Sequence, residues 1–154
     1  MMVRPLGEVR LKSGEKLHRL VVEAPDEEWA PAVRGLLAHK GWHYRWHIER
    51  ALQEPLDGLE TRFYLGLLGF EAVANIMVVE ARGVGILGHV YTRPEHRRKG
   101  IATAIMEAQM EDFRQRGGRA LTLGTGYDTP PYWIYHSFGF RSVAEGSGTM
   151  WYFT

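Results

Sequence analysis

Apolar and polar residues alternate imperfectly over Leu6–Lys12 and again over Lys16–Glu23. Ser13-Gly14 separates the two segments, and alternation on both sides of a glycine turn predicts a β-hairpin. The hairpin opens the chain, and Pro25-Asp26 is expected to end its second strand.

Two helices are predicted next, because the apolar residues take up helical spacing. Asp26 is the expected N-cap of the first helix, with Glu27-Glu28 in its first turn and Gly41 at its end. The second helix is predicted over Trp42–Gln53, since Pro55 prevents it from continuing. The apolar positions of the first helix are Trp29, Ala32, Val33, Leu36 and Leu37.

The pattern then changes to runs rich in β-branched and aromatic residues. Phe63–Leu68, Ala72–Ala81 and Val84–Thr92 are predicted as three antiparallel strands in a meander. A long helix follows over Arg98–Arg116, where apolar residues recur at helical spacing and Gly117-Gly118 ends the helix.

The remaining elements complete a single domain over residues 1–154, with residues 1–24 as an N-terminal hairpin extension. The order of elements predicts an α+β fold: a mainly antiparallel sheet with one β-α-β crossover near its centre and flanking helices. The last elements are a strand at Ala120–Gly124, a helix at Pro131–Phe138, and closing strands from Phe140 and Thr149.

Composition narrows the classes of protein. The 154 residues include 19 Lys plus Arg, 18 Asp plus Glu and no cysteine, which excludes disulfides, a thiolate nucleophile and Cys-based metal sites. A formal charge of +1 argues against a nucleic-acid scaffold. The N-terminus lacks a signal-peptide pattern, and Phe63–Ala81 is too polar to cross a membrane. We therefore expect a cytoplasmic protein without a membrane partner.

The segment Gly88–Thr103 carries the chemistry. A strand ends at Thr92, and the basic residues Arg97 to Lys99 lead into a helix at Gly100. The unpaired N–H groups and dipole of a helix N-terminus suit a phosphate, and a glycine lets an anion approach the backbone. The spacing fits neither a Walker loop nor a dinucleotide fingerprint. On spacing alone, a solvated charge run that caps a core helix is an equal alternative.

Two sequence motifs, one at Arg97–Ala102 and one at Tyr135–Phe140, resemble motifs of the GNAT superfamily of acyl-CoA N-acyltransferases and occur in the same order. Arg97-x-x-Gly100-x-Ala102 is similar to its (Gln/Arg)-x-x-Gly-x-(Gly/Ala) signature. Tyr135-x-x-x-Gly139-Phe140 is similar to its Tyr-x-x-x-Gly-Phe. The order of predicted elements agrees over nearly the whole chain, so the resemblance implies the GNAT-type fold and acetyl-CoA as the cosubstrate, with no metal.

The resemblance also implies roles for individual residues. Tyr135 matches the usual general acid that protonates the departing CoA thiolate. Asp128 stands where the family often has Asn. An Asp at this position is expected to hold the adjacent pantetheine amide differently. Arg97, Arg98 or Lys99 would contact the ribose 3′-phosphate. The pantetheine arm would lie along Val90, Tyr91 and Thr92, and the pyrophosphate on the amides of Arg98, Lys99, Gly100, Ile101, Ala102 and Thr103.

The acceptor amine must lose a proton before it attacks, and His89 or Glu80 could accept it, directly or through water. His89 is preferred because imidazole titrates near neutrality. Strand alternation predicts that His89 shares a face with Leu87 and Tyr91.

The second helix carries a dense group of aromatic residues and histidines. His43 and His47 are four residues apart, but without a third ligand a metal site is disfavoured. We hypothesise that Trp42 and Trp46 anchor this helix on the sheet while the histidines face the acceptor. Such a pocket would favour an amine with an apolar or aromatic body.

The sequence therefore predicts an N-acetyltransferase that acts on a small-molecule or peptide amine, with catalytic residues Tyr135 and His89. The first alternative is a CoA-binding sensor or interaction domain without turnover. The second is a nucleic-acid-binding domain that uses the basic cluster, which the short cluster and low net charge disfavour. The acceptor's identity and a homodimer are left open.

Overall fold

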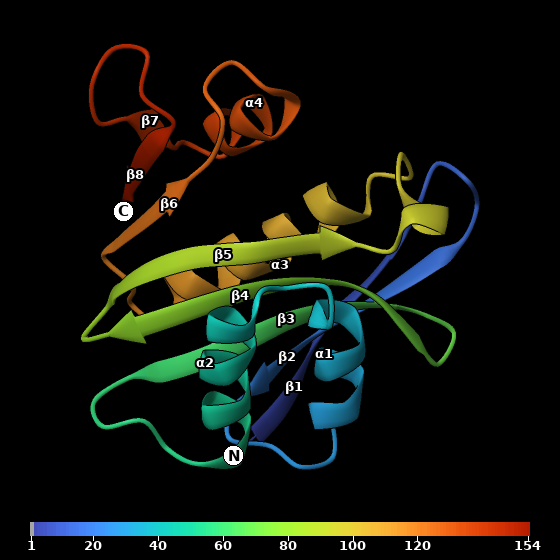
Figure 1. Ribbon diagram of the computed structural model, residues 1–154. Coiled ribbons are helices and arrows are strands. Elements are labelled where there is room, and N and C mark those ends of the chain that lie inside the picture. Colours follow the sequence, from blue (N-terminus) through green and yellow to red (C-terminus); the bar gives the residue numbers. More distant parts are fainter. Residues whose placement is uncertain (1) are drawn as a thin grey trace.

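The computed structural model describes residues 2–154, which form one eight-stranded sheet in the order β1-β2-β3-β4-β5-β6-β8-β7 (Figure 1). Paired strands are antiparallel except β5 and β6, which are parallel. The elements are β1 (Met2–Arg10), β2 (Lys16–Glu23), α1 (Ala30–Leu37), α2 (Trp42–Gln53), β3 (Glu60–Leu68), β4 (Glu71–Ala81), β5 (Val84–Thr92), the 3₁₀ helix η1 (Pro94–His96), α3 (Ile101–Gln115), β6 (Ala120–Gly124), α4 (Pro130–Ser137), β7 (Arg141–Ser142) and β8 (Thr149–Phe153).

Helices cover both faces of the sheet: α1 and α2 lie on one face and α3 lies on the other (Figure 1). Alternate residues of β3 divide between two cores. Phe63 and Leu65 pack with Leu36 on the α1–α2 side, whereas Tyr64 packs with Phe113 on the α3 side. A strand buried on both faces reads as a continuous apolar run, which is the pattern seen in β3 and β4.

The parallel pair β5–β6 creates an opening in the sheet. The two strands pair only from Val84–Ala120 to Ile86–Thr122, and α3 forms the crossover between them. Beyond Ile86 the strands diverge, and β6 runs toward α4 (Figure 1). The second half of β5 therefore borders a gap beside α3 and α4.

A β-bulge lies in that second half of β5. Asn75 pairs with Tyr91, but Met77 pairs with Gly88, so two residues of β5 oppose one residue of β4. His89 takes up the extra length with a left-handed φ of 48°. Bulges of this kind redirect side chains and are frequent next to active sites.

The predicted α+β class, the β-α-β crossover and the meander are confirmed, and α2 and β5 have the predicted bounds. The predicted N-cap of α1 is wrong. Asp26 accepts the N–H of Trp29 (2.8 Å), but the helix begins at Ala30. Pro31 has no N–H and fits only the first turn of a helix, so a helix capped at Asp26 would place it in the interior.

Other boundaries also differ from the prediction. β1 spans Met2–Arg10 rather than Leu6–Lys12, and the ends of two helices lie at other residues than expected. Gly41 does not end α1, which stops at Leu37; it is the extended N-cap of α2. The helix predicted from Arg98 begins at Ile101, because Arg98 and Gly100 have left-handed φ values of 65° and 79°. Arg98, Lys99 and Gly100 therefore belong to the loop before α3. Within residues 2–154, no helix has the length and hydrophobicity needed to cross a bilayer.

Candidate active site

Two adjoining cavities lie along the second half of β5. The first, the apolar cavity, has a volume of about 140 Å³ and is lined by Ile76, Val90, Ala102, Met106, Pro131, Ile134 and Tyr135. The second, the basic cavity, has a volume of about 360 Å³ and is lined by Val90, Tyr91, Thr92, His96, Arg97, Arg98, Gly100, Ile101, Ala102, Thr103 and Ile134. Because they share Val90, Ala102 and Ile134, the two cavities form one channel between β5, α3 and α4.

The N-terminus of α3 borders the basic cavity. Gly100 caps it without any side chain, and a Cβ at Gly100 would meet no atom within 4 Å. The first helical N–H groups have no carbonyl partner in the helix, and left-handed residues such as Arg98 and Gly100 are typical of anion-binding backbone concavities. The geometry at this end of the channel is therefore compatible with a bound anion.

The basic side chains before α3 point in different directions. Arg97 donates from Nε to the carbonyl of Thr92 (2.9 Å) and lies over the ring of Tyr91. Lys99 instead pairs with Glu15 in the turn after β1 (2.8 Å). Arg97 and Arg98 line the basic cavity and Lys99 does not. Lys99 lines an adjoining hollow beside the β1–β2 turn, which shares Arg98, Gly100 and Thr103 with the basic cavity.

Tyr135 forms part of the wall of the apolar cavity. Its side chain is buried, its ring packs near Phe140, and its hydroxyl makes no hydrogen bond to another residue in the described part of the chain. Burial raises the pKa of the Tyr135 hydroxyl. The group is therefore protonated at neutral pH and free to donate into the channel.

The predicted orientation of His89 is wrong, and the bulge is the reason. Leu87 packs in the core under α3, whereas Tyr91 packs against the core under α1 and α2. His89 contacts Tyr44 of α2, so it shares a face with Tyr91 but not with Leu87. The extra residue of the bulge breaks the alternation of side chains, which the sequence pattern alone could not reveal.

His89 is electrostatically unusual. Burial, and then the nearby cations and imidazoles of Lys40, His47 and His39, lower its pKa to about 4. The imidazole is therefore neutral at pH 7 and keeps a lone pair that can accept a proton or a hydrogen bond. The expectation that His89 titrates near neutrality is wrong, because burial and the neighbouring groups make it a weaker base than a free histidine.

The hypothesis that Trp42 and Trp46 anchor α2 on the sheet is wrong. Trp42 and Trp46 are 75% and 64% exposed, so they do not anchor the helix. Ile48, Ala51 and Leu52 do so instead. The apolar stripe toward the sheet begins only in the second half of the helix, which leaves both tryptophans beyond its edge.

Of the two histidines of α2, His47 is close enough to His89 to lower its pKa, whereas His43 is exposed. The ring of His43 is 4.2 Å from that of Tyr44, which contacts His89, and His47 acts electrostatically on His89. The expectation that they face the acceptor stays a prediction.

Glu80, the alternative base, lies far from the bulge. It pairs in register with Gly85, four residues from His89 along β5, a distance of about 13 Å at strand spacing. It is buried and pairs with Arg116 (2.7 Å) and Arg62 (3.4 Å). Glu80 therefore belongs to a structural ion-pair network.

Asp128 is exposed in the loop before α4 and does not line either cavity. Its carboxylate accepts the indole N–H of Trp133 (2.7 Å). Its predicted contact with the cofactor stays a prediction.

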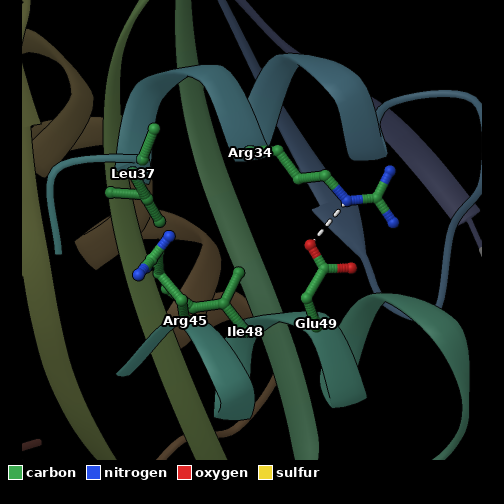
Figure 2. Close-up of a pocket in the computed structure, with 6 residues that line it drawn as sticks. Arg34, Leu37, Arg45, Ile48 and Glu49 are labelled. Carbon is green, nitrogen blue, oxygen red and sulfur yellow. Dashed lines mark hydrogen bonds and ion pairs between the residues drawn. The ribbon is translucent and has the colours of Figure 1, made fainter. Parts of the chain in front are cut away.

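A separate small cavity of about 180 Å³ lies between α1 and α2 (Figure 2). Arg34 of α1 donates to Glu49 of α2 across its mouth, with 2.6 Å between Nε and Oε2. This exposed pair connects the two helices at a distance from the channel, and the geometry gives it a structural role.

One group of potential metal ligands lies together within residues 2–154: Glu71, Glu95 and His96. Both carboxylates are exposed, Glu71 lies near Arg93, and the Nδ1 of His96 is 3.1 Å from Lys99 Nζ. Neither His43 nor His47 belongs to such a group. The absence of a metal cofactor stays a prediction.

The sequence motifs located most of the channel, but they missed its apolar lining. Ile76, Met106 and Ile134 come from three different elements and carry no motif, so only their packing reveals them. Asn75 is the one missed residue with a signal of its own, because it is a polar residue inside the apolar run of β4.

Comparisons with known proteins agree with this geometry. A family model described as the acetyltransferase (GNAT) family matches residues 16–140. No curated protein sequence gives a significant match. Several solved structures share the fold at low sequence identity, and one of them, the PaiA N-acetyltransferase from Thermoplasma acidophilum in complex with coenzyme A, is 12% identical with a TM-score of 0.60 and covers 87% of this chain and 99% of that chain.

Two further structures are similar at the level of the fold. The ribosomal-protein-S18-alanine N-acetyltransferase from Escherichia coli is 13% identical, with a TM-score of 0.66, and covers 87% of this chain and 92% of its own. A GNAT-family acetyltransferase from Staphylococcus aureus Mu50 is 12% identical, also with a TM-score of 0.66, and covers 88% and 98%.

Proposed function

Because the chain belongs to the GNAT family of acetyltransferases, we propose that it transfers an acetyl group from acetyl-CoA directly to a primary amine. The observation that carries this proposal is the channel, in which a buried tyrosine hydroxyl and an anion-binding helix end lie along one bulged strand. The PaiA enzyme from Thermoplasma acidophilum, which has the same fold, was solved with coenzyme A.

The residues of the channel fit acetyl-CoA. The N–H groups of Ile101 to Thr103 and the guanidinium groups of Arg97 and Arg98 would hold phosphates at the basic cavity. The backbone of Val90 to Thr92 would hold the pantetheine arm, and the open space beside Gly100 leaves room for the anion. When bound, acetyl-CoA supplies an activated acyl group; positioning and proton transfer are left to the protein.

The proposed reaction makes one bond and breaks one. The amine nitrogen bonds to the carbonyl carbon, the carbon–sulfur bond breaks, and Tyr135 gives its proton to the sulfur. A backbone N–H of the bulged strand polarises the thioester carbonyl. His89 or a water next to it accepts the proton that the amine loses, and the neutral imidazole is in the correct state to do so.

The acceptor is proposed to enter from the α1–α2 side. His89 and Tyr91 face that side, while Val90 and Tyr135 line the channel on the α3–α4 side. Cosubstrate and amine would then meet across the bulge. The amine is a small molecule or the amino group of a peptide, and a homodimer stays a prediction.

The test is a CoA-thiol release assay with a panel of amines that includes polyamines, aromatic amines, amino acids and peptides with free N-termini. Acetylation of any amine supports the proposal. Tight acetyl-CoA binding without acetylation across the panel would favour the sensor alternative, and absence of acetyl-CoA binding would contradict both.

A further inference from the structure

Asn75 is a buried amide at the centre of the sheet that the proposed reaction does not yet use. Its side chain has no exposed surface and lies in the apolar run of β4. Its Nδ2 donates to the backbone carbonyl of His89 (3.1 Å), across the bulge. Its Oδ1 is buried and lacks a hydrogen-bond partner among the described residues. Burying an amide whose oxygen has no hydrogen-bond partner lowers stability. The hydrogen bond made by the Asn75 nitrogen is therefore expected to have a functional role.

The bond fixes the direction of one peptide group. The His89–Val90 peptide is trans, and in a trans peptide the C=O and the following N–H point in opposite directions. Asn75 holds the His89 carbonyl toward β4. The N–H of Val90 therefore points away from the Asn75 amide.

This direction matters because Val90 lines both cavities of the channel, and Tyr135 lines one of them. We propose that Asn75 is a positioning residue: it locks the His89–Val90 peptide so that the N–H of Val90 donates to the thioester carbonyl of acetyl-CoA. The proposal rests on the proposed function and narrows its backbone donor to a single N–H. A donor fixed in advance stabilises developing charge without reorganisation during the reaction.

The same bond constrains His89. The left-handed φ of 48° is unfavourable for a non-glycine residue, and such conformations persist only where the surroundings hold them. Without the Asn75 amide, the peptide is free to rotate and take up ordinary strand pairing. The donor on one side of the bulge and the imidazole on the other would then move together.

The test uses two substitutions that remove the donor. Asn75→Leu keeps the number and branching of the heavy side-chain atoms. Asn75→Val is smaller, suits a strand and serves if the leucine variant does not fold. The control is Gln109→Leu, which also removes a fully buried amide, one that lacks hydrogen-bond partners and lies outside both cavities.

The readout is the infrared carbonyl band of bound acetyl-CoA with ¹³C in the acetyl carbonyl. We expect a shift to lower frequency in the wild type and in Gln109→Leu, and its loss in the Asn75 variants. With an active amine, kcat of the Asn75 variants should also fall about 10- to 100-fold while the Kd for acetyl-CoA changes little.

The outcomes separate this inference from the proposed function. An equal band shift in wild type and in a folded Asn75 variant would overturn the role of Asn75 and leave the acetyltransferase proposal standing. Failure of the wild type to bind acetyl-CoA would overturn both.

Discussion

The ring of Tyr44 on α2 packs edge-to-face against the imidazole of His89 on β5, with ring centroids 5.1 Å apart. The contact joins α2 to the bulge in β5. It also removes one side of the imidazole from water. Since burial is the main cause of the low pKa of His89, this contact contributes to keeping the residue neutral.

The low pKa of His89 predicts a pH dependence of stability. The folded imidazole has a pKa of about 4 and the unfolded one about 6.5, so the unfolded chain binds the extra proton between these values. This contribution to stability is complete above pH 6.5 and is lost as the pH falls toward 4. Denaturant unfolding at pH 7 and pH 4.5 should show a smaller loss in His89→Gln than in the wild type. Equal losses in the two proteins would contradict the low pKa.

Gly100→Glu should weaken acetyl-CoA binding. The carboxylate would occupy the open space at the N-terminus of α3 and repel the phosphates. The loss of charge-assisted hydrogen bonds, about 1.5–3 kcal/mol, corresponds to about 10- to 100-fold in Kd. Titration calorimetry measures this change. Gly58→Glu is the control, because Gly58 also has a left-handed φ and open space but lies in the loop before β3; unchanged affinity in Gly100→Glu would refute the assignment.

Tyr135→Phe should lower kcat about 10²- to 10⁴-fold, the usual contribution of general acid catalysis, with little change in acetyl-CoA affinity. The ring packing against Phe140 is retained and only the proton donor is lost. Tyr132→Phe is the matched control, since Tyr132 is a buried tyrosine of the same helix whose hydroxyl bonds to Ser142. Full activity of Tyr135→Phe would mean that water or another group protonates the thiolate.

Asp112 should be critical for stability. It is buried, it binds Arg4 and Arg116, and it accepts the hydroxyl of Tyr64 (2.6 Å). Burial raises the pKa of Asp112, but the hydrogen bonds from these three groups outweigh burial and hold the pKa below its usual value. Its contribution is therefore present above pH 3.8 and is lost below it, outside the window in which His89 acts.

Asp112→Asn should lower the free energy of unfolding by about 1.5–3 kcal/mol, because it removes a buried charge that accepts several hydrogen bonds. The loss is limited because Arg116 keeps its ion pair with Glu80 and Arg4 keeps its ion pair with Glu23. Glu49→Gln, which weakens the exposed Arg34–Glu49 pair, should cost about 1 kcal/mol or less. Urea denaturation at pH 7 measures both. Similar values for the two variants would show that burial does not set the strength of these pairs.

The order of the elements, the α+β class and the position of the loop before α3, which we propose binds an anion, follow from the sequence alone. These features depend on local properties: the spacing of apolar residues, the turn residues between strands, and the glycine before α3. The two motifs around Gly100 and Tyr135 carried the resemblance to the GNAT superfamily, which the family model over residues 16–140 confirms.

Which groups meet across the sheet depends on register and packing, which the sequence pattern did not reveal. The bulge at His89 depends on its register with β4, which places the Asn75 amide against its carbonyl. The ion pairs of Glu80 removed it from the candidate bases. Register and packing join residues far apart in the chain, and a one-residue bulge reverses the side-chain alternation on which sequence patterns rely. The fold could therefore be predicted from local sequence patterns, whereas long-range contacts set the orientation of the candidate catalytic groups.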